Sequence, residues 1–172
     1  MGMSMSLDGF IAAKNDSPQL PLGEDGDQLH EWLFRNDNQD VKQVMAAAPT
    51  TSPMRLGARA RVQCQMCPTF MLTHRPKEPD GPLMKFVASV DEALEQARAA
   101  AGDKNVEIMG ANAQQQFLKA GLIDEISVDI VPVILSEGVR LFDHLEGRHI
   151  RLKQIKSAAG GQVTHLTYAV IK

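Results

Sequence analysis

Cysteine, long apolar runs and excess positive charge are all scarce in this sequence, and each shortage excludes a class of protein. The 172 residues carry a formal net charge of −3, so no global positive field attracts nucleic acid or an anionic membrane surface. No apolar run approaches the roughly 18 to 20 residues of a transmembrane helix. We therefore expect neither a nucleic-acid partner nor a membrane partner.

The two cysteines, Cys64 and Cys67, form a lone C-x-x-C pair. Structural zinc needs two further ligands at comparable spacing, and the sequence has no second C-x-x-C pair. A redox pair of the thioredoxin type should open a helix, but Pro68 and a predicted strand follow Cys67. Residues 1–6 lack the basic start and the long apolar stretch of a secretory signal. We therefore expect a cytoplasmic protein with free thiols and no metal site.

The remaining composition is typical of one globular domain over residues 1–172. Hydrophobic residues make up 44% of the chain and charged residues 23%, enough to bury a core without disulfides. Ser89 and Glu92 form a capping box that predicts the start of a helix, and Gly102 predicts its end. Around it, strands and helices alternate: strands at 86–88, 106–109 and 126–135, helices at 90–101 and 113–120. This alternation predicts a parallel sheet with right-handed crossovers.

Near the N-terminus the signals are shorter. Residues 7–13 read as an apolar strand interrupted by Asp8 and Gly9, and residues 15–26 have the composition of a loop. Asp27 is placed to cap a helix that runs to residue 36. The remaining predicted elements are a helix at 39–48 and a strand at 70–74.

At the C-terminus, two strands at 149–156 and 162–172 flank a Gly-Gly turn and predict an antiparallel hairpin. The fold class is therefore α/β: a mostly parallel mixed sheet with helices on both faces and a C-terminal antiparallel hairpin. We expect one sheet with residues 106–109 in its interior.

Two glycine turns carry the first functional candidates. Gly110 stands where a predicted strand ends and a helix begins, and there backbone N–H groups and the helix dipole favour a phosphate. The alternative is that Gly110 only makes the turn. Residues 136–138 follow the strand at 126–135, at the edge where parallel sheets place their ligands, although an ordinary surface turn explains them equally well.

Polar side chains in apolar surroundings form the second group of candidates. Asp8 interrupts an apolar segment, so its carboxylate either marks a turn or faces a solvated pocket. Trp32 lies in the apolar stripe of the first helix and is expected in the core, with His30 as an exposed neighbour. The other histidines considered fit surface or hairpin positions: His144, His149 and His165.

Five segments in the same order resemble one family, and the combined order is specific although each segment alone is not. They are SLDGFIA at 6–12, LHEWLF at 29–34, IMGAN at 108–112, AGLIDE at 120–125 and PVILSEGVRLF at 132–142. Over about residues 4–44 and 68–172 the chain resembles stand-alone dihydrofolate-reductase-like proteins. These are similar to the reductase half of the bifunctional riboflavin-biosynthesis deaminase–reductase.

The resemblance implies an NADPH-dependent homodimer that transfers a hydride to a pterin-like or pyrimidine-like heterocycle. Carried over residue by residue, the catalytic candidates are Asp8 and Glu31. The residues expected to hold the cofactor are Gly9, Ile11, Ala12, Gly110, Ala111 and Asn112. The residues expected on the substrate side are Trp32, Glu137, Gly138 and Leu141.

Two departures from the family pattern bear on activity. The cofactor turn of the family usually has two consecutive glycines, whereas Ala111 takes the second place here. After Val44 and Met45 the family expects Gly-Arg-Arg-Thr-Tyr-Asp, whose basic residues grip the 2′-phosphate of NADPH, whereas this chain has AAAPTT at 46–51. The alternative to an active reductase is therefore an inert relative with impaired dinucleotide binding that persists as a structural dimer.

Residues 46–67 suggest a further hypothesis about the gene. Deleting one G from a GC-rich stretch encoding Met-Gly-Arg-Arg-Thr-Tyr-Asp (ATG GGC CGC CGC ACC TAC GAC) gives ATG GCC GCC GCA CCT ACG AC. This reads Met-Ala-Ala-Ala-Pro-Thr-Thr, as at residues 45–51, and the family pattern resumes at Pro68. We therefore interpret 46–67 as a frame-shifted segment that forms a poorly supported loop without ligand contacts and with incidental cysteines, with a natural loop insertion as the alternative. Sequencing the gene on both strands distinguishes the two.

Overall fold

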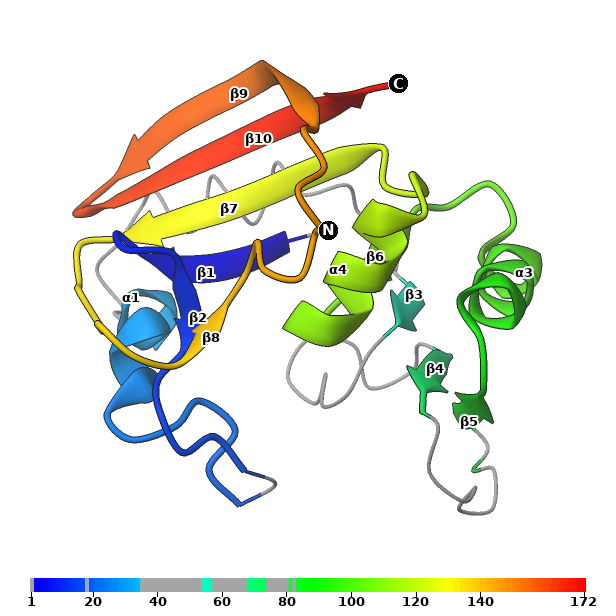
Figure 1. Cartoon of the computed structure of the whole chain (residues 1–172), viewed down its shortest axis with the longest axis horizontal. Helices are drawn as coiled ribbons and strands as arrows, with labels where there is room; N and C mark the ends of the chain where they lie inside the picture. The colour runs from blue at the N-terminus through cyan, green and yellow to red at the C-terminus, as the bar shows by residue number, and fades with distance from the viewer. Residues whose placement is uncertain (1, 18, 35–53, 57–67, 74–80, 82) are drawn as a thin grey trace.

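The computed structural model of the chain describes residues 2–17, 19–34, 54–56, 68–73, 81 and 83–172. Within them, the strands form three hydrogen-bonded sheets, two of four strands and one of two. Segments from both ends of the chain share one four-stranded sheet, and the middle of the chain forms the other (Figure 1). The predicted helix at 39–48 and most of the segment 46–67 lie outside the described residues. The part of that segment that is described, residues 54–56, is a strand paired on both sides and not the predicted poorly supported loop.

The first sheet has the order β1-β7-β10-β9. Strand β1 (Gly2–Ser6) pairs in parallel with β7 (Glu125–Val131), and β7 pairs antiparallel with β10 (Val163–Ile171). Strand β9 (Arg151–Gly160) pairs antiparallel with β10, which confirms the predicted C-terminal hairpin. Strand β7 ends before Pro132, which has no N–H to donate to a ladder, and so is shorter than the run predicted at 126–135.

The second four-stranded sheet is parallel throughout. Its strands follow the order β5 (Met84–Val87), β4 (Thr69–Leu72), β3 (Met54–Leu56) and β6 (Val106–Ile108). Together the sheets give the predicted mix of parallel strands and one antiparallel hairpin.

The expectation of one sheet with residues 106–109 in its interior is wrong. Among the described residues β6 pairs with β3 alone. The strand has three residues, and Glu107 lies beside Gly2 of β1, with its Oε1 3.5 Å from the position of a Cβ added to Gly2. The two sheets therefore meet edge to edge without a shared ladder.

The two-stranded sheet explains the apolar segment 7–13. Strand β2 (Phe10–Ala12) pairs antiparallel with β8 (Val139–Arg140). Residues 7–9 are a turn between β1 and β2 and not part of one strand: Gly9 N–H donates to Ser6 O at 3.0 Å. Gly9 has a φ of 93°, which explains the glycine after Asp8.

The helices differ in how well local signals predicted them. Helix α3 (Val90–Ala101) begins and ends as predicted, with Ser89 Oγ accepting from Glu92 N–H at 3.1 Å. Helix α4 (Ala111–Lys119) begins two residues before the predicted start at 113. The first predicted helix is instead a 3-10 helix, η1 (Gly26–Leu29), followed by one short turn, α1 (Glu31–Phe34). Asp27 lies inside η1 and is not its cap.

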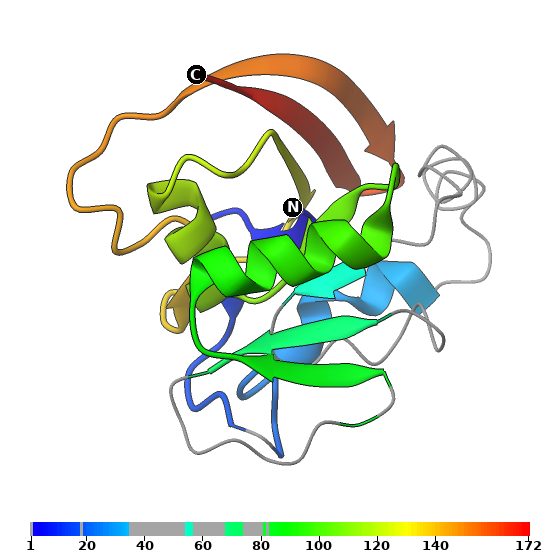
Figure 2. The same cartoon turned by 90° about the vertical axis from the view of Figure 1, so that its right-hand side faces the viewer.

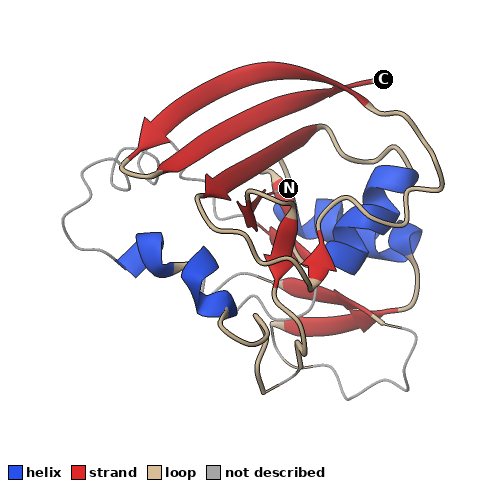
Figure 3. Cartoon of the chain, turned by 60° about the vertical axis from the view of Figure 1, so that its left-hand side comes forward, coloured by secondary structure: helices blue, strands red, loops and turns tan. Residues whose placement is uncertain are grey.

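Helices η1 and α1 lie on one face of the first sheet, and helix α4 lies on the other. Figure 3 shows η1 and α1 on one side of the molecule and α3 and α4 on the other. On β10, Leu166 and Tyr168 pack into the core that contains Phe117 of α4, whereas Val163 packs with Leu29 and Trp32. Helix α3 lies along the β3–β6 sheet (Figure 2) and buries a stripe of alanines against it: Ala93, Ala97 and Ala101.

Candidate functional site

Asp8 joins the turn after β1 to the loop after β7. Its Oδ1 accepts from Ser6 Oγ at 2.6 Å and from Leu135 N–H at 3.2 Å, and its Oδ2 accepts from Ser136 N–H at 2.8 Å. These hydrogen bonds, led by the one from Ser6, lower the pKa of Asp8 to about 2. Asp8 is therefore ionised at neutral pH. Its geometry is that of a clamp between two loops and not that of a proton donor.

The Asp8 clamp makes acid stability depend on this carboxylate. Its folded pKa of about 2 lies below the ordinary value of 3.8, so its stabilising effect is complete above pH 3.8 and is lost as the pH falls towards 2. We expect the Asp8→Asn variant to unfold at a lower temperature than the wild type near neutral pH. The gap between the two should close between pH 3.8 and 2, as measured by thermal melts across that range.

The control for this experiment is Asp16→Asn, the same substitution at an exposed aspartate in the loop that follows residues 10–12. Parallel melting curves for wild type and Asp8→Asn at every pH would contradict the clamp.

Gly138 lets the loop after β7 pack directly on the backbone of β2. A Cβ at this position would lie 2.1 Å from Ala12 O and 2.9 Å from Ala13 Cα, and the φ of Gly138 is 136°. No side chain fits in this contact. The next residue, Val139, pairs with Ala12 in the two-stranded sheet. Gly138 therefore lies against the strand that the resemblance assigns to the nicotinamide.

Gln115 ties helix α4 to these loops. Its Nε2 donates to the carbonyl oxygens of Arg140 at 3.0 Å and Leu141 at 3.2 Å. Leu141 N–H in turn donates to Gly9 O at 3.2 Å. The helix that follows Gly110, strand β8 and the turn at Gly9 are thus one hydrogen-bonded unit.

Gln114 fixes the other side of the same helix. Its side chain is fully buried, and its Nε2 donates to Ile108 O at 2.8 Å, at the end of β6. Sequence reasoning missed both glutamines. The available signal was a run of three glutamines at 114–116 within the short helix pattern that begins after Gly110, where an amphipathic helix normally buries apolar residues.

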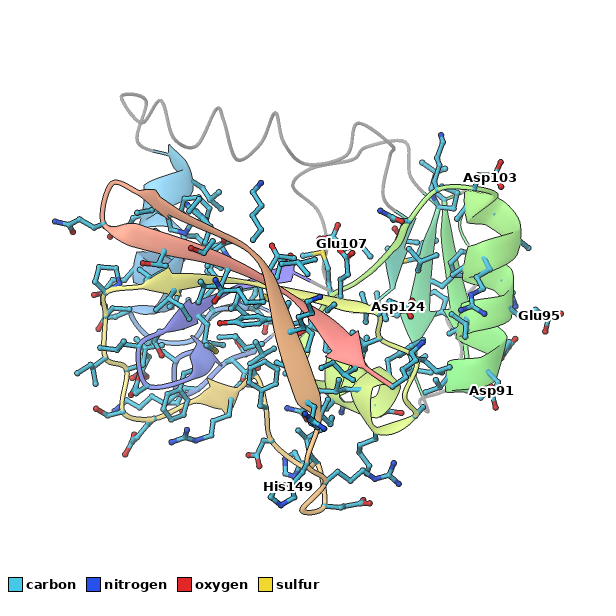
Figure 4. The ribbon with its side chains drawn as sticks, turned by 90° about the horizontal axis from the view of Figure 1, so that it is seen from above. Asp91, Glu95, Asp103, Glu107, Asp124 and His149 are labelled. Atoms are coloured by element: carbon cyan, nitrogen blue, oxygen red, sulfur yellow. The ribbon has the colours of Figure 1, made fainter. Side chains whose placement is uncertain are left out.

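The first turn of α4 is open towards an anion. Gly110 is its N-cap with a φ of 85°, no side chain caps it, and no acidic residue lies in its first turn. The N–H groups of Ala111 and Asn112 and the positive end of the helix dipole are therefore available to a phosphate. Helix α3 differs because Ser89 caps it and acidic residues fill its first turn. Figure 4 shows one of these, Asp91, pointing away from the body of the chain.

Glu31 and Trp32 line a groove of about 530 Å³ beside the Asp8 clamp. Its other walls are Gln28, the end of β7 at 131–133 and the hairpin turn at 160–163. The groove adjoins the turn that holds Asp8, because Val133 O accepts from Leu7 N–H at 2.9 Å. Glu31 is exposed, whereas Trp32 is 8% exposed and forms part of the core.

The remaining predicted site residues have varied positions. Leu141 is 1% exposed within the main core, so its side chain does not line the mouth of a site. Glu137 is exposed, with its Oε2 4.0 Å from Lys14 Nζ. Ile11 is buried, and Asn112 is exposed and accepts from Gln116 Nε2.

The structure places His165 as expected but not His30. His165 lies in strand β10 of the C-terminal hairpin, and it is buried there, at 7% exposure, because it lies under Trp32. His30 is half-buried, and burial lowers its pKa while the nearby charges of Asp129 and Asp27 oppose this effect.

The described part of the chain contains no group of three or more His, Cys, Asp or Glu side chains able to hold a metal ion. No helix in that part is long and apolar enough to cross a membrane. Cys64 and Cys67 lie outside the described residues.

Solved structures share this fold. A protein assigned to riboflavin biosynthesis in Shewanella sp. PV-4 matches with a TM-score of 0.71 at 23% sequence identity, covering 99% of this chain and 97% of that chain. RibD of Acinetobacter baumannii (form 2) matches with a TM-score of 0.62 at 17% identity, covering 99% of this chain and 56% of that chain.

The third structure is from Thermotoga maritima, a diaminohydroxyphosphoribosylaminopyrimidine deaminase/5-amino-6-(5-phosphoribosylamino)uracil reductase. It matches with a TM-score of 0.56 at 12% identity, covering 99% of this chain and 55% of that chain. This chain therefore spans about half the length of the Acinetobacter and Thermotoga proteins. The predicted α/β fold class is confirmed, because the Shewanella protein shares the fold over 99% of this chain.

Sequence comparison supports the same relationship. No curated protein sequence matches the chain significantly. The family model of the RibD C-terminal domain matches residues 50–166, more than half of the chain. The chain belongs to the RibD C-terminal domain family, which is the reductase part of a riboflavin-biosynthesis enzyme.

Proposed function

We propose that this chain is a cytoplasmic NADPH-dependent reductase that transfers a hydride to a pyrimidine-like or pterin-like heterocycle. One observation carries the proposal beyond family membership. The open first turn of α4 is joined through Gln115 and Leu141 to the turn at Gly9, so the phosphate-binding and nicotinamide-binding candidates form one unit.

The residues of this unit fit a dinucleotide. Gly110, Ala111 and Asn112 would hold the pyrophosphate at the N-terminus of α4. Gly9, Ile11 and Ala12 would border the nicotinamide, with Gly138 supporting the backbone of β2. When bound, NADPH supplies the hydride. The role of Asp8 in this proposal is to hold the two loops together, since its carboxylate stays ionised.

The groove is the proposed place of the heterocycle. Glu31 presents a carboxylate there, and Trp32 contributes an aromatic wall. The Thermotoga relative is named as a reductase of 5-amino-6-(5-phosphoribosylamino)uracil, and we propose a substrate of that pyrimidine class for this chain. In this arrangement Glu31 donates the proton that the heterocycle takes up together with the hydride.

A fluorescence titration with NADPH tests the function. The same titration with NADH, which lacks the 2′-phosphate, tests the effect of the missing arginines. Because residues 46–51 lack the basic side chains expected by resemblance, the preference for NADPH over NADH should be well below ~100-fold, or about 2.7 kcal/mol. A preference retained at that level would show that other residues grip the 2′-phosphate. Absence of binding to either dinucleotide would overturn the proposal in favour of an inert relative.

We also propose that the chain forms a homodimer. Strand β9 is a ten-residue edge strand that pairs, within the described residues, with β10 alone. It exposes Leu152 at 40% and Ile155 at 50%, and Phe142 at 43% lies in the loop beyond β8. Uncovered strand edges and apolar side chains of this kind favour a partner. Light scattering at micromolar concentration should give twice the monomer mass, and a clean monomer would contradict the dimer.

A further inference from the structure

Three polar side chains lie in one row across the first sheet, on the face covered by η1 and α1. Ser4 of β1 is in register with Asp129 of β7, and Asp129 is in register with His165 of β10. Ser4 is 4% exposed and His165 is 7% exposed, so two members of the row are buried. Their apolar neighbours on this face include Val163, two residues before His165. A polar row in such a core requires a specific reason.

Trp32 lies across both ends of this row. Its Nε1–H donates to Ser4 Oγ at 3.3 Å and to Leu29 O at 3.1 Å. Its ring meets the ring of His165 edge to face, with the centroids 5.1 Å apart and the planes at 60°. The indole is therefore located by a hydrogen bond on one side and an aromatic contact on the other.

Asp129 fixes the ring of His165. The distance between Asp129 Oδ1 and His165 Nδ1 is 2.6 Å, and the Asp129 side chain is 28% exposed. Asp129 also lies near His30: burial lowers the pKa of His30, and the charge of Asp129 opposes this shift, although no hydrogen bond joins the two. The partly buried pair of Asp129 and His165 adds little net stability compared with apolar side chains of similar volume, but it fixes orientation. The orientation fixed here is that of the ring beneath Trp32.

We propose that His165, oriented by Asp129, is a positioning residue for Trp32 and so sets the shape of the groove. Trp32 and Val163 both line the groove, and His165 contacts the first and lies two residues from the second on the same face of β10. The inference rests on the proposed function, because it takes the ligand of the groove to be a pyrimidine-type substrate. His165 and Asp129 act through Trp32 and do not touch the ligand.

Three variants separate the two contacts of His165. His165→Phe keeps a ring beneath Trp32 but loses the bond to Asp129. His165→Asn keeps a donor that reaches Asp129 but loses the ring. Asp129→Asn removes the charge at nearly constant volume. The matched control is Thr164→Ala, an exposed neighbour on the opposite face of β10.

Trp32 is the one tryptophan of the chain, so its emission and its quenching by acrylamide report on this position alone. We expect all three variants to change both signals and the control to leave them unchanged. Binding of 5,6-diaminouracil should weaken about tenfold in His165→Asn, the scale of the one aromatic contact that this variant loses, and less in His165→Phe, which keeps the ring. NADPH affinity should stay within about twofold of the wild type.

Two failures are distinguishable in this design. A wild type that binds neither NADPH nor 5,6-diaminouracil contradicts the proposed function, and the Trp32 signals still test the positioning. Folded His165 variants with wild-type emission and quenching overturn the positioning role, whatever the wild type binds. If the His165 variants do not fold, Asp129→Asn decides by the same criterion.

Discussion

Replacing Gly138 by alanine should lower the free energy of unfolding by about 2–6 kcal/mol. Two costs add: a side chain at a φ of 136°, about 1–3 kcal/mol, and a methyl group forced into the backbone of Ala12 and Ala13, about 1–3 kcal/mol. For a chain of this size the melting temperature should fall by roughly 10 °C. Cofactor binding should weaken in parallel, since β2 borders the proposed nicotinamide site.

Gly147 provides the matched control for this prediction. Its φ is 71°, also positive, but a Cβ there meets nothing within 4 Å. Gly147→Ala should therefore cost only the backbone term, about 1 kcal/mol, with no effect on NADPH affinity. Equal melting temperatures for the two variants would show that the contact between Gly138 and Ala12 is absent in solution.

The second large effect is expected at the start of α4. Gly110→Val places a branched side chain at a φ of 85° and a ψ of 133°, where the first turn must approach the pyrophosphate. We expect NADPH affinity to fall about 100-fold, or about 2.7 kcal/mol, in a fluorescence titration. The loss has two sources, the shifted N–H groups of Ala111 and Asn112 and the steric block by the side chain.

Gly121 follows the other end of α4 and separates binding from folding. Its φ is 69°, and a Cβ there meets nothing within 4 Å. Gly121→Val should destabilise the same helix through its backbone while leaving NADPH affinity near the wild-type value. Equal affinity for the wild type and Gly110→Val would refute the assignment of the cofactor turn.

The parts of the fold predicted correctly are those set by neighbouring residues. Helix α3 follows from Ser89, Glu92 and Gly102, all within or beside the helix. The structure confirms the cap at Ser89 and the end at Gly102, and the Glu92 carboxylate accepts from Ala88 N–H, one residue before the cap. The C-terminal hairpin follows likewise from its own turn. The edge position of β6 was not predictable in this way, because it depends on which strand edges meet, a property of residues far apart in sequence such as Gly2 and Glu107.

The same division applies to the candidate site. Asp8 was identified from its unusual surroundings, but its role depends on two amides more than 120 positions later in the chain. Leu141 looked like a site residue because its segment matches the family, yet its side chain is in the core. His165 looked like a hairpin residue, and only the register of β10 with β7 shows that it is buried beside Asp129. Pairings across strands, which no local pattern encodes, decide all three.

The pairing of β1 with β7 also constrains how the chain is made. Residues 2–6 leave the ribosome more than 100 residues before their ladder partners at 127–131, and the amides that satisfy Asp8 also follow only later. Until then the apolar segment at 10–13 lacks its partner β8. A strand left unpaired over that interval can pair with another nascent chain, so slower synthesis before residue 127 should favour aggregation over folding.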